Sequence, residues 1–164
     1  MNSRSDSRRD ALRAALALPL AGLARVAAAG QAATPAVADF DAAVWARLLQ
    51  SGPRPAAYVF TTTWCSTCPA VFELLQARIA ATRQHVELVA VVMDAQGPQA
   101  LAHARHYRGM TRLYTFNGFE PEIRYAVDPK WRNITPYVVL LGRQGSDQRV
   151  IGPPDEQRLR AWLA

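Results

Sequence analysis

Apolar residues occur along the chain in two kinds of pattern. Three nearly continuous apolar runs span residues 57–62, 86–93 and 134–141. Such runs predict strands that are buried on both faces of a sheet. After the first run, apolar residues recur every three or four positions in a stripe formed by Val71, Phe72, Leu75 and Ile79. This spacing predicts an amphipathic helix that covers the strands with one face.

Weaker patterns and turn residues indicate the remaining elements. We predict a helix that continues to residue 81 after the first strand, and further helices at residues 39–50, 99–108, 120–127 and 155–163. Asp39 is the expected cap of the first of these. Additional strands are predicted at 111–116 and 148–151, the latter joined to 134–141 by a hairpin turn. The alternation predicts an α/β fold with a central mixed sheet of four to five strands flanked by helices.

The reactive residues are concentrated in the segment Trp64-Cys65-Ser66-Thr67-Cys68-Pro69. It holds the only two cysteines of the 164 residues and joins the first predicted strand to the next helix. Free N–H groups and positive potential at a helix N-terminus favour the thiolate form of the first cysteine. The second cysteine lies one turn further on, where its sulfur can attack a mixed disulfide. The pattern favours redox chemistry.

Two other interpretations of the cysteine pair stay open. A four-sulfur zinc site needs a second Cys-x-x-Cys, which the sequence lacks. An inert structural disulfide is the other alternative, although a bridge across three residues constrains little chain entropy and would stabilise the fold poorly.

Residues 1–29 have the composition of a signal peptide. Arg8 and Arg9 precede an Ala/Leu-rich run at 14–24, which is shorter than the roughly 20 residues that a spanning helix needs. The paired arginines resemble a twin-arginine export signal, with Ala11 in place of the usual phenylalanine. We expect cleavage after Ala29 or Ala38, a linker at 30–38 and a single domain at 39–164. The alternatives are an amphipathic N-terminal helix or an uncleaved leader that acts as a membrane anchor.

The leader also changes the charge balance. The formal net charge is +6, but five arginines and two aspartates in the leader contribute +3 of it. No basic run with interleaved aromatic residues occurs, so nucleic acid is not an expected partner.

The predicted leader implies a periplasmic protein. Because a pair of cysteines outside the cytoplasm is normally oxidised, we expect the two cysteines to form a disulfide.

From residue 39 to 164 the chain resembles the thioredoxin-like superfamily, and within it the exported TlpA/ResA-type thiol–disulfide oxidoreductases. The resemblance depends on the cysteine motif and on Thr135-Pro136, which precedes an apolar strand and a hairpin turn. It implies that Cys65 is the attacking thiolate, that Cys68 is the resolving thiol, and that Trp64 shapes the docking surface. It also implies a cis Pro136, with the backbone of Thr135 paired to an extended partner segment.

The chain departs from these relatives in its acidic residues. Thioredoxin has a buried acid in the strand before its motif, whereas residues 57–63 contain no carboxylate. Exported reductases often carry a glutamate shortly after the second cysteine. Glu73 lies five residues after Cys68, where helix rotation directs it elsewhere, so we interpret it as a solvated helix residue.

A copper-handling role is the main alternative. The motif also resembles that of the Sco copper proteins, which use two cysteines and a distant histidine, and thiolates bind Cu(I). The available histidines are His85, His103 and His106. We interpret them as solvated and Met93 as a core residue, so no metal ligand is assigned.

The sequence thus predicts an exported thiol–disulfide oxidoreductase that uses a redox-active Cys65–Cys68 disulfide and needs no cofactor. Its expected partners are periplasmic protein thiols and disulfides, with an upstream thiol–disulfide donor. Family likeness favours reduction of partner proteins over oxidation.

Overall fold

The computed structural model describes residues 36–164. The predicted leader and most of the predicted linker lie outside the described residues. The elements in chain order are β1 (Val37–Phe40), α1 (Ala42–Ser51), β2 (Ala56–Thr61), α2 (Cys68–Ala80), β3 (Glu87–Val92), α3 (Gly97–Ala104), β4 (Arg112–Phe116), α4 (Glu120–Val127), β5 (Tyr137–Leu141), β6 (Gln148–Ile151) and α5 (Glu156–Leu163). The expected α/β class and the element order from β2 onward are confirmed.

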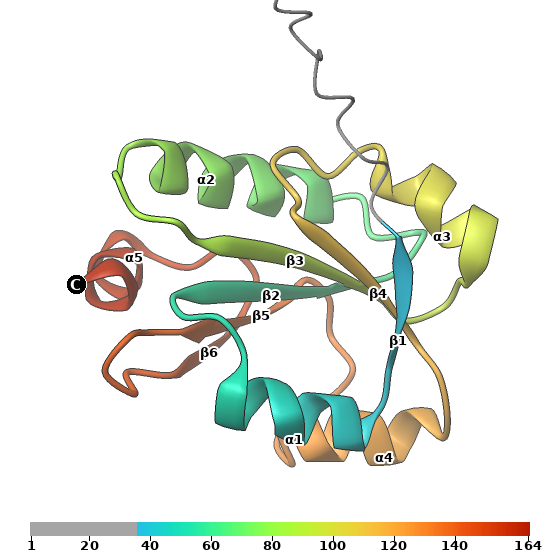
Figure 1. The fold of residues 1–164 in the computed structure, drawn as a ribbon. Helices are drawn as coiled ribbons and strands as arrows, with labels where there is room; N and C mark the ends of the chain where they lie inside the picture. Colours follow the sequence, from blue (N-terminus) through green and yellow to red (C-terminus); the bar gives the residue numbers. More distant parts are fainter. Residues whose placement is uncertain (1–35) are drawn as a thin grey trace, which may run out of the picture. The chain divides into compact units, whose positions relative to one another are not determined.

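The strands form one mixed sheet in the order β1-β4-β3-β2-β5-β6 (Figure 1). Strands β1, β4, β3 and β2 run parallel, whereas β5 is antiparallel to β2 and β6 is antiparallel to β5. The sheet therefore has six strands instead of the four to five that we predicted.

The additional strand is β1, and it corrects the predicted start of the domain. Val37 and Ala38, which were assigned to the linker, pair in parallel with β4. Asp39 also lies in this strand, and the cap of α1 is Asp41, whose carboxylate accepts the Val44 N–H at 2.6 Å. A four-residue strand has little hydrophobic periodicity, so its pairing with a segment about 75 positions later left no clear local signal.

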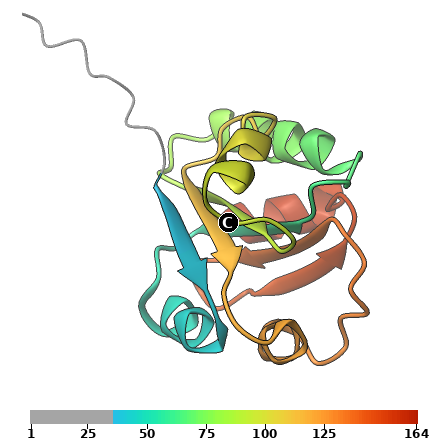
Figure 2. The same cartoon turned by 90° about the vertical axis from the view of Figure 1, so that its right-hand side faces the viewer.

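Burial on both faces of the sheet explains the continuous apolar runs. Along β2, Ala57 and Val59 face a core shared with α2, α3 and α5. The alternate residues Tyr58 and Phe60 face a second core shared with α1 and α4. Figure 2 shows the two groups of helices on opposite sides of the strands. Because successive strand residues point to opposite faces, the two cores together bury every residue of β2.

Several predicted boundaries shift by a few residues. The third helix ends at Ala104 rather than at 108. Strand β5 begins at Tyr137, three residues later than predicted, because the chain makes a turn around Pro136 before it enters the sheet. No helix among residues 36–164 is long and apolar enough to cross a bilayer.

Candidate active site

The cysteine motif lies where β2 leads into α2. Cys65 is held in a turn, in which its N–H donates to the Thr62 carbonyl at 3.1 Å and its carbonyl accepts the Cys68 N–H at 3.3 Å. Helix α2 starts at Cys68, with Pro69 in its first turn, where the missing N–H costs little. Cys65 and Cys68 form a disulfide with their Cα atoms 5.5 Å apart. The strand-to-helix placement predicted for the pair is confirmed.

The two sulfur-bearing residues differ in their access to solvent. Cys68, the first residue of α2, is fully buried in the core between α2 and the sheet, whereas Cys65 retains an exposed fraction of 8%. Trp64 beside it is 74% exposed. Thr67 occupies the cap position of α2 without a side-chain hydrogen bond to the helix, and its hydroxyl lies 3.9 Å from the Cys65 sulfur. An incoming group therefore reaches the pair from the Cys65 side.

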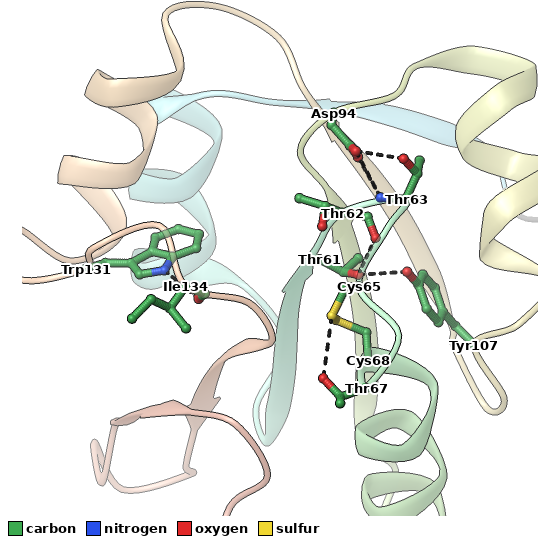
Figure 3. Close-up of a disulfide and its surroundings, with 10 residues drawn as sticks. All are labelled: Thr61, Thr62, Thr63, Cys65, Thr67, Cys68, Asp94, Tyr107, Trp131 and Ile134. Atoms are coloured by element: carbon green, nitrogen blue, oxygen red, sulfur yellow. Dashed lines mark hydrogen bonds between the residues drawn. A yellow bond between two sulfur atoms is a disulfide. The ribbon is translucent and has the colours of Figure 1, made fainter.

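Asp94, at the end of β3, holds the loop before the motif. Its carboxylate accepts the Thr63 N–H at 2.9 and 3.0 Å and the Thr63 hydroxyl at 2.7 Å (Figure 3). The adjacent Thr61 is fully buried, and its hydroxyl pairs with that of Tyr107 at 2.7 Å. Burial raises the pKa of Tyr107 to about 12, against the opposing effect of this hydrogen bond. The Tyr107 hydroxyl therefore stays neutral at physiological pH.

His103 differs from its predicted solvated state. It is half-buried on α3, with its ring packed edge-on against Tyr107 at a centroid distance of 5.3 Å. Its buried Nε2 has no hydrogen-bond partner among the described residues. Burial lowers the pKa of His103, and His106 lowers it further, while Asp94 opposes the shift. His85 and His106 are exposed as predicted.

The Thr135–Pro136 peptide bond is cis, which confirms the predicted isomer. The antiparallel β2–β5 ladder ends with the pair Phe60 and Tyr137, so Pro136 and Thr61, their next neighbours along the chain, both lie at this end of the ladder. The two segments singled out in the sequence therefore meet at one end of the sheet. Pro136 is buried, whereas Ile134, two residues before it, is 49% exposed.

The segment before Pro136 is anchored by a residue that the sequence analysis did not identify. The indole N–H of Trp131 donates to the Ile134 carbonyl at 3.0 Å (Figure 3). The Trp131 ring also stacks on Tyr137 at a centroid distance of 4.4 Å. Trp131 has no spacing relationship to the cysteine motif. Asp94 and Tyr107 were missed for the same reason, since only the fold brings them to the end of β2.

The other candidate residues lie outside this group. Glu73 is exposed on α2, with its nearest cationic partner, Arg108, at 3.8 Å, as expected of a solvated residue. Met93 packs against the core shared with α1 and α4. Within residues 36–164, no group of three His, Cys, Asp or Glu side chains is arranged to hold a metal ion, so the copper alternative remains a prediction without structural support.

No protein-family model matches the chain, and no curated protein matches it. Several solved structures are similar to it. A secreted Mycobacterium tuberculosis disulfide oxidoreductase homologous to Escherichia coli DsbE is 20% identical, with a TM-score of 0.48 over 65% of this chain and 81% of that one. A thioredoxin-related protein from Neisseria meningitidis serogroup B is 17% identical, with a TM-score of 0.49 over 68% and 84%. StoA from Bacillus subtilis is 20% identical, with a TM-score of 0.44 over 65% and 80%.

Proposed function

We propose that the protein is an exported thiol–disulfide oxidoreductase that reduces disulfides of periplasmic partner proteins through a mixed disulfide on Cys65. The observation that carries this proposal is the unequal burial of the two cysteines at the start of α2, with 8% exposure for Cys65 and none for Cys68. An attacking sulfur must reach a partner, whereas a resolving sulfur needs only to reach its neighbour.

The proposed cycle starts from the dithiol form. The Cys65 thiolate attacks one sulfur of the partner disulfide, forms an S–S bond to it and releases the other partner sulfur as a thiolate. The Cys68 thiolate then attacks the Cys65 sulfur, closes the Cys65–Cys68 disulfide and releases the second partner thiolate. Two electrons pass to the partner, and an upstream thiol donor must reduce the disulfide again. No further cofactor is needed for this chemistry.

The start of α2 supplies the electrostatic part of the proposal. The first-turn N–H groups of a helix lack intrahelical acceptors and carry positive potential. Thr67 does not occupy them with its side chain. A thiolate on Cys65 would therefore be stabilised at this position, as it is at other helix N-termini, where cysteine pKa values fall to about 3.5–7.5.

Trapping of partners tests the assigned roles. The Cys68→Ser variant should accumulate mixed disulfides with partner proteins in the periplasm, because the resolving step is lost. The Cys65→Ser variant should accumulate none. Equal behaviour of the two variants would show that the roles are wrongly assigned. Recovery of the mature protein from the periplasm would test the proposed export in the same preparation.

The direction of electron flow requires a separate measurement. A reduction potential of about −270 mV would suit a reductant of partner proteins, and one of about −120 mV would suit an oxidant. We expect the former value, and equilibration of the purified protein with glutathione redox buffers would measure it.

A further inference from the structure

A second feature lies at the same end of the sheet as the cysteines. Tyr137 pairs with Phe60 of β2 on one side and with Ile151 of β6 on the other. The Gly152 N–H donates to the Pro136 carbonyl at 2.8 Å. The ends of β2, β5 and β6 therefore lie in a row, and the end of β6 is two strand spacings, or about 10 Å, from that of β2.

A hollow of about 340 Å³ opens beside this end of β6. Its lining comes from the loop after α4, from β5 and β6, and from α5: Asp128, Lys130, Trp131, Tyr137, Arg149, Val150, Ile151 and Arg158. The same Trp131 that anchors the Ile134 carbonyl thus forms part of the hollow. Trp131 therefore connects the hollow directly to the loop before Pro136.

Positive charge predominates among the lining side chains. The lining includes three cationic side chains, Lys130, Arg149 and Arg158, and one carboxylate, Asp128. That carboxylate already accepts the Tyr137 hydroxyl with one oxygen and the Lys130 backbone N–H, at 2.8 Å, with the other. Burial works against ionisation of Asp128, but these hydrogen bonds and the nearby cations lower its pKa overall.

The three cations differ in how far they are already engaged. Arg158 forms a salt bridge with Asp155 at 2.7 Å. The Nε of Arg149 donates to the Val127 carbonyl at 3.1 Å, which fixes the guanidinium beside the hollow. Among the residues that the structure describes, neither Arg149 nor the Lys130 ammonium forms a salt bridge. The hollow therefore offers two cations to an incoming anion.

The surroundings of the hollow suit an extended chain rather than a small ion. Ile151, at its rim, is 54% exposed, and the stacked rings of Trp131 and Tyr137 form an apolar wall. Strand β6 is the outermost strand on this side of the described sheet. A partner segment that crosses from Cys65 past Ile134 toward Ile151 would meet apolar surface first and the cations next.

We propose that this hollow binds an acidic side chain of the partner segment that presents its disulfide to Cys65. The inference rests on the proposed function and narrows its substrate class to partners with an aspartate or glutamate near the reacting cysteine. An extended segment advances about 3.3 Å per residue, so a span of about 10 Å corresponds to about three residues. With the length of the lysine and arginine side chains added, we expect the acid three to five residues from the cysteine.

The test uses short peptides whose single cysteine forms a mixed disulfide with mercaptoethanol. Three peptides differ only in the residue four positions from the cysteine, which is Glu, Gln or Lys. The fully reduced protein should react with the Glu peptide about threefold to tenfold faster than with the Gln peptide at low salt, and more slowly with the Lys peptide. The difference should shrink in 0.5 M salt, at about a threefold shorter Debye length than in buffer near 0.05 M.

Substitutions of the charged residues test whether the preference for the Glu peptide arises at the hollow. Lys130 is exposed, so Lys130→Glu should fold normally, and it should remove or reverse the preference for the Glu peptide. Arg149→Gln should weaken the preference without introducing a negative charge. Arg83→Glu is the matched control, because this exposed residue follows the opposite end of α2 from the cysteines. The control variant should keep the wild-type preference.

The outcomes separate this inference from the proposed function. If the Gln peptide is reduced by every variant but the Glu peptide gains nothing in the wild-type protein, the inference is overturned and the oxidoreductase activity stands. If no peptide is reduced, the activity fails, and binding of Cys→Ala peptides, followed by fluorescence anisotropy, still tests the hollow. Competition by inorganic phosphate at the same concentration as the peptide would assign the hollow to small anions and overturn the docking of a partner segment.

Discussion

The Asp94 carboxylate accepts the backbone N–H of Thr63, shared between its two oxygens, and also accepts the Thr63 hydroxyl; Thr63 lies two residues before Cys65. The acid lies two residues after the end of β3, and the threonine lies in the loop after β2. The contact thus joins two neighbouring parallel strands at the point where one of them leads into the cysteine motif. Because the Cys65 N–H also donates to the Thr62 carbonyl, the position of the Cys65 sulfur depends on this loop.

The Asp94→Ala variant should loosen the motif more than it unfolds the protein. The hydrogen bonds are exposed, so we expect a loss of about 1 kcal/mol in the free energy of unfolding, less than the about 1.5–3 kcal/mol typical of bonds to a charged group. The rate of thiol–disulfide exchange at Cys65 should fall several-fold, because the sulfur is held less firmly. Urea unfolding and stopped-flow exchange with a small disulfide would measure the two effects.

Glu73→Gln is the control for this prediction. Glu73 is an exposed carboxylate on α2, five residues after Cys68, and its ion pair with Arg108 at 3.8 Å is weak. Its removal should change neither quantity by a measurable amount. A control variant that slows exchange as much as Asp94→Ala would attribute the effect to surface charge rather than to the Thr63 contact.

The buried hydroxyl pair of Thr61 and Tyr107 predicts a loss of stability in alkali. Burial raises the pKa of Tyr107 to about 12, and burial also raises the pKa values of Tyr58 and Tyr137. Unfolded tyrosine titrates near about 10, so the folded state holds more protons than the unfolded state above that pH. These tyrosines should therefore leave the free energy of unfolding unchanged below about pH 10 and lower it as the pH rises further.

Tyr107→Phe isolates one residue of this set. The variant should lose about 1–2 kcal/mol at neutral pH, since the Thr61 hydroxyl loses its partner in a buried site. Its stability should then fall less steeply between about pH 10 and 12 than that of the wild-type protein. Denaturant titrations at a series of alkaline pH values would compare the slopes, and parallel slopes would contradict the assignment of this proton to Tyr107.

The half-buried environment of His103 should make the free energy of unfolding depend on pH with the opposite sign at low pH. Burial and the neighbouring His106 lower its pKa below the ordinary value. The unfolded state therefore binds a proton that the folded state does not, and stability should fall as the pH drops below about 6.5. His103→Gln should flatten this part of the profile, whereas substitution of the exposed His85 should not. An unchanged profile in the His103 variant would assign the acid sensitivity to carboxylates instead.

The elements that the sequence predicted best are those whose signal is local. Helix α4 and strand β6 have the predicted bounds, and the cysteine motif lies at the predicted junction. Strand β1 was missed because its four residues are stabilised by pairing with β4 rather than by their own pattern. Helix α3 ends early at Ala104, and Tyr107 is buried in the loop beyond it, which a helical pattern cannot distinguish from a further turn.

Among the residues of the site, too, those with a local sequence signal were identified and those brought in only by the fold were not. Cys65, Cys68 and Pro136 were identified because each belongs to a short motif with a defined spacing or a strand position. Asp94 and Trp131 contact the motif or the loop before Pro136 only through the order of the strands, and neither has a sequence feature that sets it apart. The absence of an acid in β2 was visible in the sequence, but the neutral Thr61–Tyr107 pair at the end of the same strand required the fold.

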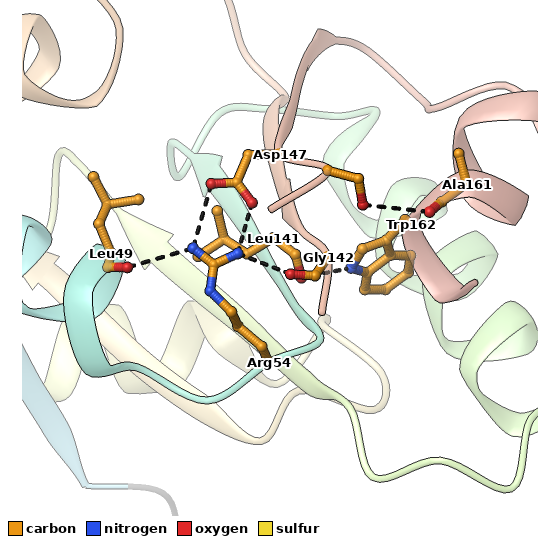
Figure 4. Close-up of polar contacts among 8 residues, drawn as sticks. Leu49, Arg54, Leu141, Gly142, Asp147, Ala161 and Trp162 are labelled. Carbon is orange, nitrogen blue, oxygen red and sulfur yellow. Dashed lines mark hydrogen bonds and ion pairs between the residues drawn. The ribbon is translucent and has the colours of Figure 1, made fainter. Parts of the chain in front are cut away.

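At the end of the sheet opposite to the cysteines, Arg54 fixes the hairpin between β5 and β6 (Figure 4). Its guanidinium donates to both oxygens of Asp147, at 2.6 and 3.3 Å, and to the Gly142 carbonyl at 2.9 Å. Both charged side chains are about three-quarters buried. Removal of one partner would leave the other charge poorly solvated, which makes this pair more important than a surface ion pair.

Asp147→Asn should therefore lower the free energy of unfolding by about 1–3 kcal/mol. The loss should persist at high salt, because a partly buried pair is screened less than a surface pair. Arg160→Gln removes an exposed arginine whose pair with Glu156 spans 3.4 Å on α5, and it should cost at most about 0.5 kcal/mol. Urea unfolding of both variants at low and high salt measures the difference. Since the hairpin end is remote from Cys65, exchange rates of the folded Asp147→Asn protein should equal those of the wild type, and a slower rate would contradict the separation of the two ends.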